Sequence, residues 1–233
     1  MRLALWPLLI VATCAPAADG PSIADDLGGV EVPRPSLRPA YAGPIYFPPS
    51  LGEPTFRCKF GDPARLQPIL SDFERDWYSR QLAAAEEPSL YLASQSARPL
   101  DGSTLRFTWL RSFHPPVVIR LEMGAAPAGP HRLVAKQLSG AGGYHPGKVA
   151  KTIDRPLTPE EAERLRVALD RNRVFGIPPD PCGGGCDGAQ WIFEGVEGRR
   201  YRFLSVWTPH TGPALGLGQF LMGLTGWDFG TVY

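Results

Sequence analysis

Apolar and polar residues alternate with a period of two in several stretches of the chain, and this pattern predicts β-strands. Residues 105–111 place Leu, Phe and Trp on one side, and 117–123 form a β-branched run. Residues 131–138 continue the pattern after a turn rich in Gly and Pro, so the three segments predict an antiparallel meander. Residues 190–196 and 201–207 flank a Glu-Gly-Arg turn and predict a hairpin.

Helical spacing of apolar residues predicts three helices. The first spans residues 62–87, opening with an Asp-Pro pair, although Pro68 offers a later start. Its apolar face consists of Leu66, Leu70, Phe73 and Trp77. The second begins after Thr158, where Thr-Pro-Glu-Glu follows the capping-box pattern, and the third spans 215–224. Helices and antiparallel strands in this order predict a single compact α+β domain.

The first 17 residues have the pattern of a secretory signal peptide. Arg2 precedes an apolar run, residues 3–11, that is too short to span a bilayer, and small residues follow it. Cleavage after Ala17 releases a soluble protein. In the alternative interpretation, Val-Ala-Thr-Cys is a lipoprotein box and Cys14 carries a lipid anchor. Both readings place the rest of the chain in the periplasm or on an envelope membrane.

Residues 18–55 form a proline-rich spacer between the signal and a globular domain that spans 56–233. Seven prolines lie between residues 32 and 54, which favours extended backbone over helix or central strand. The second half of the spacer carries three aromatic residues, Tyr41, Tyr46 and Phe47. The alternative that this half packs on the domain as a strap therefore stays open.

The chain has four cysteines, and Cys14 is either removed or lipidated in the mature protein. A glycine run separates Cys182 from Cys186, and it is flexible enough to bring the two into disulfide geometry. We therefore predict a Cys182–Cys186 bridge and a buried free thiol at Cys58, with Cys58 paired to one of the other two as the alternative. Two cysteines with scattered histidines make a poor zinc signature, so we predict no metal site.

Charge and motifs exclude several classes of function. The net charge is +1 without a basic cluster, which argues against nucleic acid as a partner. Residues 142–148 match the spacing of a phosphate-binding loop, but Val149 replaces the hydroxyl residue that holds magnesium. We therefore predict no nucleotide and no other cofactor. The match is better explained as a glycine-rich turn with Tyr144 as its anchor, or as a loop that grips a ligand.

Glu194 is the candidate for chemistry, because it lies on a strand whose two faces are both largely apolar. A carboxylate there needs a partner, and Arg202 on the neighbouring strand is the predicted one. The alternative is a catalytic acid or base that works with His145 or His210. Three aromatic residues nearby are predicted core residues, or alternatively a sugar-stacking platform: Trp191, Tyr201 and Trp207.

Three blocks of the sequence carry a resemblance to a known group of proteins. They are Trp-Tyr-Ser with Glu-Pro-Ser-Leu (77–79 and 87–90), the glycine-rich block 140–147, and Asp-Gly-Ala-Gln-Trp-Ile-Phe-Glu (187–194) with Tyr201 and Trp-Thr-Pro (207–209). The chain resembles uncharacterised exported, lipoprotein-like proteins of proteobacteria. The resemblance covers most of the chain after the spacer and implies export but no activity.

Together these features favour a non-catalytic envelope protein that binds another envelope protein or a polymer. Contact with a membrane is expected only through the lipid anchor, and the sequence leaves the oligomeric state open. The competing hypothesis is an envelope hydrolase or carbohydrate-active protein that uses Glu194 with a histidine.

Overall fold

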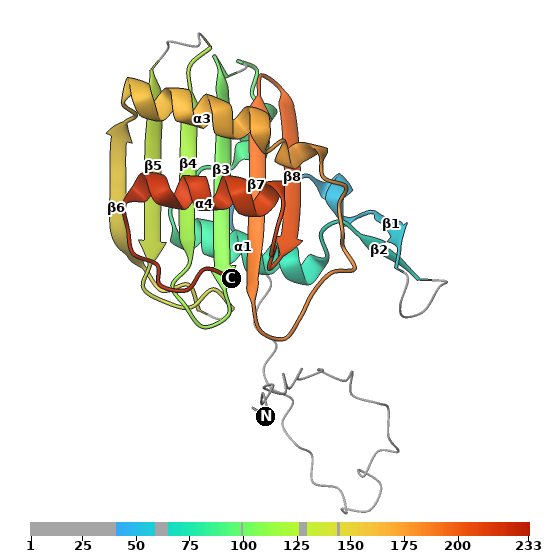
Figure 1. Ribbon diagram of the computed structural model, residues 1–233. Coiled ribbons are helices and arrows are strands. Elements are labelled where there is room, and N and C mark those ends of the chain that lie inside the picture. The colour runs from blue at the N-terminus through green and yellow to red at the C-terminus, as the bar shows by residue number, and fades with distance from the viewer. Residues whose placement is uncertain (1–40, 59–64, 99, 126–129, 144) are drawn as a thin grey trace, which may run out of the picture. The chain divides into compact units, whose positions relative to one another are not determined.

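The computed structural model describes residues 41–58, 65–98, 100–125, 130–143 and 145–233. They contain a six-stranded antiparallel sheet with the strand order β6-β5-β4-β3-β7-β8, helices on both of its faces and a small β1-β2 hairpin (Figure 1). The strands of the sheet are β3 (Ser103–Arg111), β4 (Val117–Met123), β5 (His131–Leu138), β6 (Val149–Pro156), β7 (Ala189–Glu197) and β8 (Arg200–Trp207). The fold is therefore α+β, as predicted.

Helices α3 (Pro159–Arg171) and α4 (Pro213–Thr225) cross one face of the sheet, and α1 (Asp72–Ala84) lies on the other (Figure 1). The short helix α2 (Leu90–Ser94) packs near β7 and β8. Among the helices of the described residues, none is long and apolar enough to span a membrane.

The sequence predicts the meander β3–β5 and the hairpin β7–β8, and both are confirmed. The edge strand β6 and the hairpin of β1 (Pro54–Arg57) and β2 (Leu66–Pro68) were not predicted. The β3–β7 ladder, with nine residue pairs, joins the meander to the hairpin. Strand β3 therefore lies in the middle of the sheet, where its side chains are covered on both faces.

The two faces of the sheet differ in chemistry. The face under α3 and α4 is apolar except at the end of β3, where the Arg111 guanidinium lies 4.1 Å from the Trp109 ring; it includes Phe107, Trp109, Trp191 and Phe193. The face under α1 mixes apolar with charged side chains, because Arg106 on β3 and Glu194 on β7 both point to it. The period-two alternation of a strand thus separates an apolar core from a face that contains buried charges.

The capping signals explain where the helices begin. Thr158 and Glu161 form the predicted capping box at α3. Helix α1 begins at Asp72 with Ser71 as its cap, ten residues later than the Asp-Pro start, which lies outside the described residues. The predicted apolar face of this helix is wrong at three positions, because Leu66 lies on β2, Leu70 precedes α1 and Phe73 is 74% exposed.

Residues 41–53, here called the strap, pack against the α1 side of the sheet. Tyr46 and Phe47 are 3% and 1% exposed, and Phe47 contacts Tyr78 and Phe203 edge-on. Arg75 of α1 donates hydrogen bonds to the carbonyls of Phe47 and Pro48. The second half of the proline-rich segment therefore belongs to the folded unit, as the strap alternative predicted.

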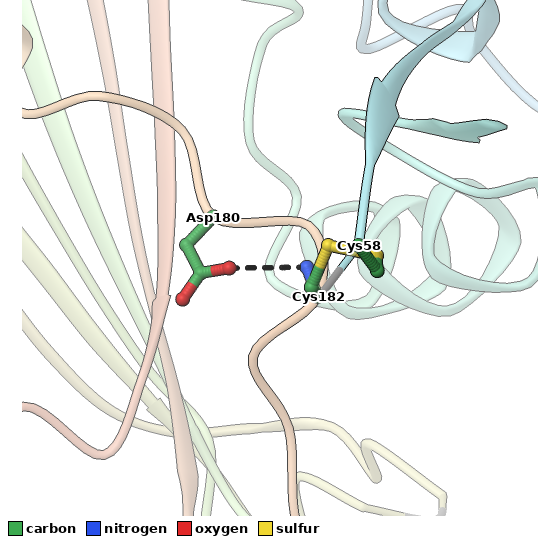
Figure 2. Close-up of a disulfide and its surroundings, with 3 residues drawn as sticks. All are labelled: Cys58, Asp180 and Cys182. Carbon is green, nitrogen blue, oxygen red and sulfur yellow. Dashed lines mark hydrogen bonds between the residues drawn. A yellow bond between two sulfur atoms is a disulfide. The ribbon is translucent and has the colours of Figure 1, made fainter. Parts of the chain in front are cut away.

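A disulfide joins Cys58 to Cys182, with a Cα–Cα distance of 5.6 Å (Figure 2). The predicted Cys182–Cys186 bridge and the free thiol at Cys58 are therefore wrong, and the alternative, Cys58 paired to one of the other two cysteines, is confirmed. Figure 2 also shows the carboxylate of Asp180 accepting a hydrogen bond from the Cys182 amide. The bridge ties the end of β1 to the loop before β7. Spacing along the chain gave no sign of this proximity because 124 residues separate the two cysteines.

Candidate functional site

A buried ion pair between strands β3 and β7 contains the candidate Glu194. Register places Glu194 directly opposite Arg106. The guanidinium Nε donates to Glu194 Oε2 over 2.8 Å, and its Nη2 lies 2.7 Å from the same oxygen. Tyr201 donates its hydroxyl to Glu194 Oε1 over 2.9 Å. Both carboxylate oxygens are therefore engaged, and the side chains of the pair are 0% exposed.

A second carboxylate, Glu87, extends this pair across the sheet. It follows α1 and lies 2.8 Å from Arg120 on β4, 3.0 Å from Lys136 on β5 and 3.9 Å from Arg106. Lys136 also donates to the carbonyl of Ala85. We call these five ionisable residues the charge cluster: Glu87, Arg106, Arg120, Lys136 and Glu194. Three cations surround two carboxylates, so each buried charge has a partner of opposite sign.

The strap and the residues after α1 cover the charge cluster. The Tyr46 ring lies 5.8 Å from the Arg106 guanidinium, and the Tyr46 hydroxyl donates to the Glu87 carbonyl over 2.9 Å. Arg106 donates a further hydrogen bond, 2.6 Å long, to the carbonyl of Pro88. Arg106 and Glu194 consequently have no contact with solvent.

Burial dominates the electrostatics of the charge cluster. Desolvation raises the pKa of Glu194 above its usual value, against the opposing effects of the Arg106 guanidinium and the Tyr201 hydroxyl. Desolvation also raises the pKa of Tyr201 well above 10.0 and that of Tyr46 to about 12. Both phenols therefore stay protonated at neutral pH and act as hydrogen-bond donors.

The predicted partner of Glu194, Arg202, is wrong. Arg202 pairs with Gly195 across the hairpin, so its side chain lies on the opposite face of the sheet from Glu194. There its guanidinium lies 5.9 Å from the Phe175 ring. The carboxylate finds its cation on β3 instead. No local pattern indicates this pairing, because 88 residues separate Arg106 from Glu194.

The structure does not gather the other candidate residues around Glu194. His145 is exposed in the turn between β5 and β6, and His210 is exposed after β8. Neither is hydrogen-bonded to Glu194, whose described donors are Arg106 and Tyr201. Tyr144 lies outside the described residues, as do Cys14 and the predicted signal peptide.

The two candidate tryptophans, Trp191 and Trp207, pack against other parts of the protein. Trp191 is 0% exposed, packs 5.3 Å from the Phe107 ring and donates to the main-chain oxygen of Tyr233 over 3.0 Å. Trp207 ends β8, where its indole lies against the backbone of Gly185 and Gly188. Trp191 is thus a core residue, and Trp207 supports the loop that follows the disulfide.

An open groove of about 780 Å³ lies between α3 and α4 on the opposite face of the molecule from the strap. Its lining is Glu163, Arg164, Val167, Ala168, Arg171, Asn172, Gly212, Pro213, Gly216 and Phe220. Sequence reasoning missed this groove, since the lateral spacing of the two helices depends on how both pack on the sheet. Val167, apolar and 50% exposed within the otherwise charged outer face of α3, was the available signal.

Among the described residues, no group of three or more His, Cys, Asp or Glu side chains is placed to hold a metal ion. No protein-family model matches the chain, and no curated protein matches its sequence significantly.

Proposed function

We propose that this chain is an exported, non-catalytic binding protein of the cell envelope, located in the periplasm or held at an envelope membrane by a lipid on Cys14. The Cys58–Cys182 disulfide supports an oxidising compartment, since cross-links of this kind are rare in the reducing cytosol. The pattern of the first 17 residues and the resemblance to exported, lipoprotein-like proteins support the same location.

The enclosure of Glu194 is the observation that favours binding over hydrolysis. A general acid or base has to come within hydrogen-bond reach of the group that it protonates or deprotonates. Here Arg106 and Tyr201 occupy both carboxylate oxygens, and the strap covers the pair. The charge cluster therefore serves the fold, and the groove between α3 and α4 is the surface that we assign to binding.

A photo-crosslinking experiment in the native envelope tests this assignment. A benzophenone amino acid at Val167 samples the groove. The same residue at Leu92 on α2, which is similarly exposed at 47%, is the matched control. We expect a defined adduct with an envelope component from position 167 and none from position 92. Equal labelling at both positions, or labelling at neither, contradicts a binding role for the groove.

Two further measurements test the location and the absence of catalysis. The intact mass of protein taken from its own envelope distinguishes an acylated chain that starts at Cys14 from a soluble one that starts near Ala18. The wild-type protein is also assayed against envelope polymers. Cleavage of any polymer that disappears in a folded Glu194→Gln variant would overturn the non-catalytic assignment.

A further inference from the structure

The groove between α3 and α4 has an apolar floor. Val167, Ala168 and Phe220 contribute apolar side chains to it, and Gly216 adds no side chain of its own. Its volume of about 780 Å³ falls within the range of about 300–1,000 Å³ that is usual for small-molecule sites. The floor therefore suits an alkyl chain.

The two helices run antiparallel along this groove (Figure 1). A side chain at Gly216 would collide with the Asn172 amide, so the first turn of α4 lies against the end of α3. From Arg171 back to Arg164, α3 spans seven residues, or about 10.5 Å of helix. This length defines the long axis of the groove, with Arg171 at one end and Arg164 at the other.

An arginine lies at each end of the groove, but Arg164 interacts electrostatically with Glu160 and Glu161, so the Arg171 end carries the less compensated positive charge. Among the described contacts, Arg171 makes no ion pair, and the first turn of α4 beside it has neither a side-chain cap nor an acidic residue. The acidic lining residue, Glu163, lies at the other end and is 2.6 Å from Arg166, which offsets its charge. The groove thus combines an apolar length with a cationic mouth.

We propose that the groove binds a medium-chain fatty acid, with its alkyl chain along Val167, Ala168 and Phe220 and its carboxylate at Arg171. This inference rests on the proposed binding function and names its ligand class. A single chain fits the length between Arg171 and Arg164, whereas a phospholipid would bring a second chain. The carboxylate fits a guanidinium that has no acidic partner in the described structure.

Equilibrium dialysis of radiolabelled decanoate against the full mature protein, below micelle-forming concentrations, tests the proposal. We expect saturable binding at one site. Val167→Glu places a carboxylate in the apolar groove and should weaken decanoate binding at least tenfold. Leu92→Glu, a similarly exposed helical position on the other side of the sheet, should leave it unchanged. Circular dichroism checks that both variants are folded.

Head-group recognition is tested by Arg171→Gln. This variant should weaken decanoate binding three- to tenfold and leave decanol binding unaltered, since decanol lacks the charge. Wild-type protein that shows no saturable decanoate binding overturns the proposal. So does equal affinity for decyltrimethylammonium, or undiminished decanoate binding by Val167→Glu. Capture by phosphatidylglycerol vesicles without decanoate binding also overturns it, in favour of a membrane surface.

The crosslinking result separates this proposal from the proposed function. A specific protein adduct at Val167 without decanoate binding refutes the fatty acid and leaves a binding role for the groove. If position 167 gives no adduct and the wild-type protein binds no decanoate, the fatty-acid proposal and the binding role of the groove are both refuted.

Discussion

Glu194→Gln tests whether the buried carboxylate serves the fold. The substitution keeps the shape of the side chain and an oxygen that accepts from Arg106, but it removes the negative charge. Arg106, whose side chain is 0% exposed, then has Glu87 as its nearest described carboxylate, at 3.9 Å. An uncompensated guanidinium in the interior is the expected source of instability.

The expected loss of stability depends on which partners Arg106 keeps in the variant. Removing one partner of a buried ion pair costs about 3–5 kcal/mol. Two features reduce this figure, because Arg106 retains the Pro88 carbonyl at 2.6 Å and Glu87 nearby. We therefore expect Glu194→Gln to lower the free energy of unfolding by about 2–4 kcal/mol.

Urea unfolding monitored by tryptophan fluorescence and far-ultraviolet circular dichroism, with the disulfide intact, measures this loss. The control is a triple variant that removes the polar group together with both of its described side-chain partners, Arg106→Met, Glu194→Leu and Tyr201→Phe. Replacing a buried pair by apolar side chains of similar volume is often neutral or stabilising, so the triple variant should regain most of the lost stability.

The reasoning is refuted if Glu194→Gln unfolds within about 0.5 kcal/mol of the wild type, the range of an ordinary surface substitution. It is also refuted if the triple variant is less stable than Glu194→Gln. Either result would mean that the charge of Glu194 is not what compensates Arg106.

Three other predictions concern the rest of the fold. Serine at both Cys58 and Cys182 should lower the free energy of unfolding by about 2–4 kcal/mol in a urea titration, because the cross-link spans 124 residues; an unchanged midpoint would contradict this. Phe47→Ala should cost about 3–5 kcal/mol by the same measurement, whereas Ile45→Ala, at a strap position 57% exposed, should cost less than about 0.5; equal losses would show that the strap is not anchored by its buried ring. A hydrogen bond from Arg155 lowers the pKa of Glu161 from 4.5 to about 2, so its ionised form adds stability above pH 4.5 that is lost as the pH falls towards 2. Glu161→Gln should therefore be less stable than the wild type by about 1–2 kcal/mol at neutral pH, after allowance for solvent screening, and this difference should vanish in acid.

Local signals in the sequence predicted the elements that depend on neighbouring residues. The Thr158 capping box and the turn at Gly198 are each contained within a few residues, and both are found in the structure. Strand positions in the meander were predictable for the same reason, since each strand shows its own period-two alternation.

Non-local contacts explain what the sequence left open or predicted wrongly. The local pattern predicts a partner for Glu194 on the adjacent strand of the hairpin, but register puts Arg202 on the other face and Arg106 opposite the carboxylate. Likewise, Cys182 bonds to a residue 124 positions away rather than to one four positions away. Each partner was decided by which segments lie side by side, and that information is spread over most of the chain.

The β3–β7 ladder has a consequence for the order in which the chain can fold as it is made. The meander of β3, β4 and β5 forms from one continuous stretch, but its inner edge at β3 has no partner until β7 emerges. The strap, although earlier still, has to wait as well, since Phe47 packs on Phe203 of β8. A nascent chain that ends before residue 189 therefore exposes a hydrophobic strand edge and an undocked aromatic segment, both liable to aggregate or be cleaved. We infer that the sheet can be completed only after the last fifth of the chain has been synthesised. A chaperone that binds the nascent chain would be needed most just before that segment emerges.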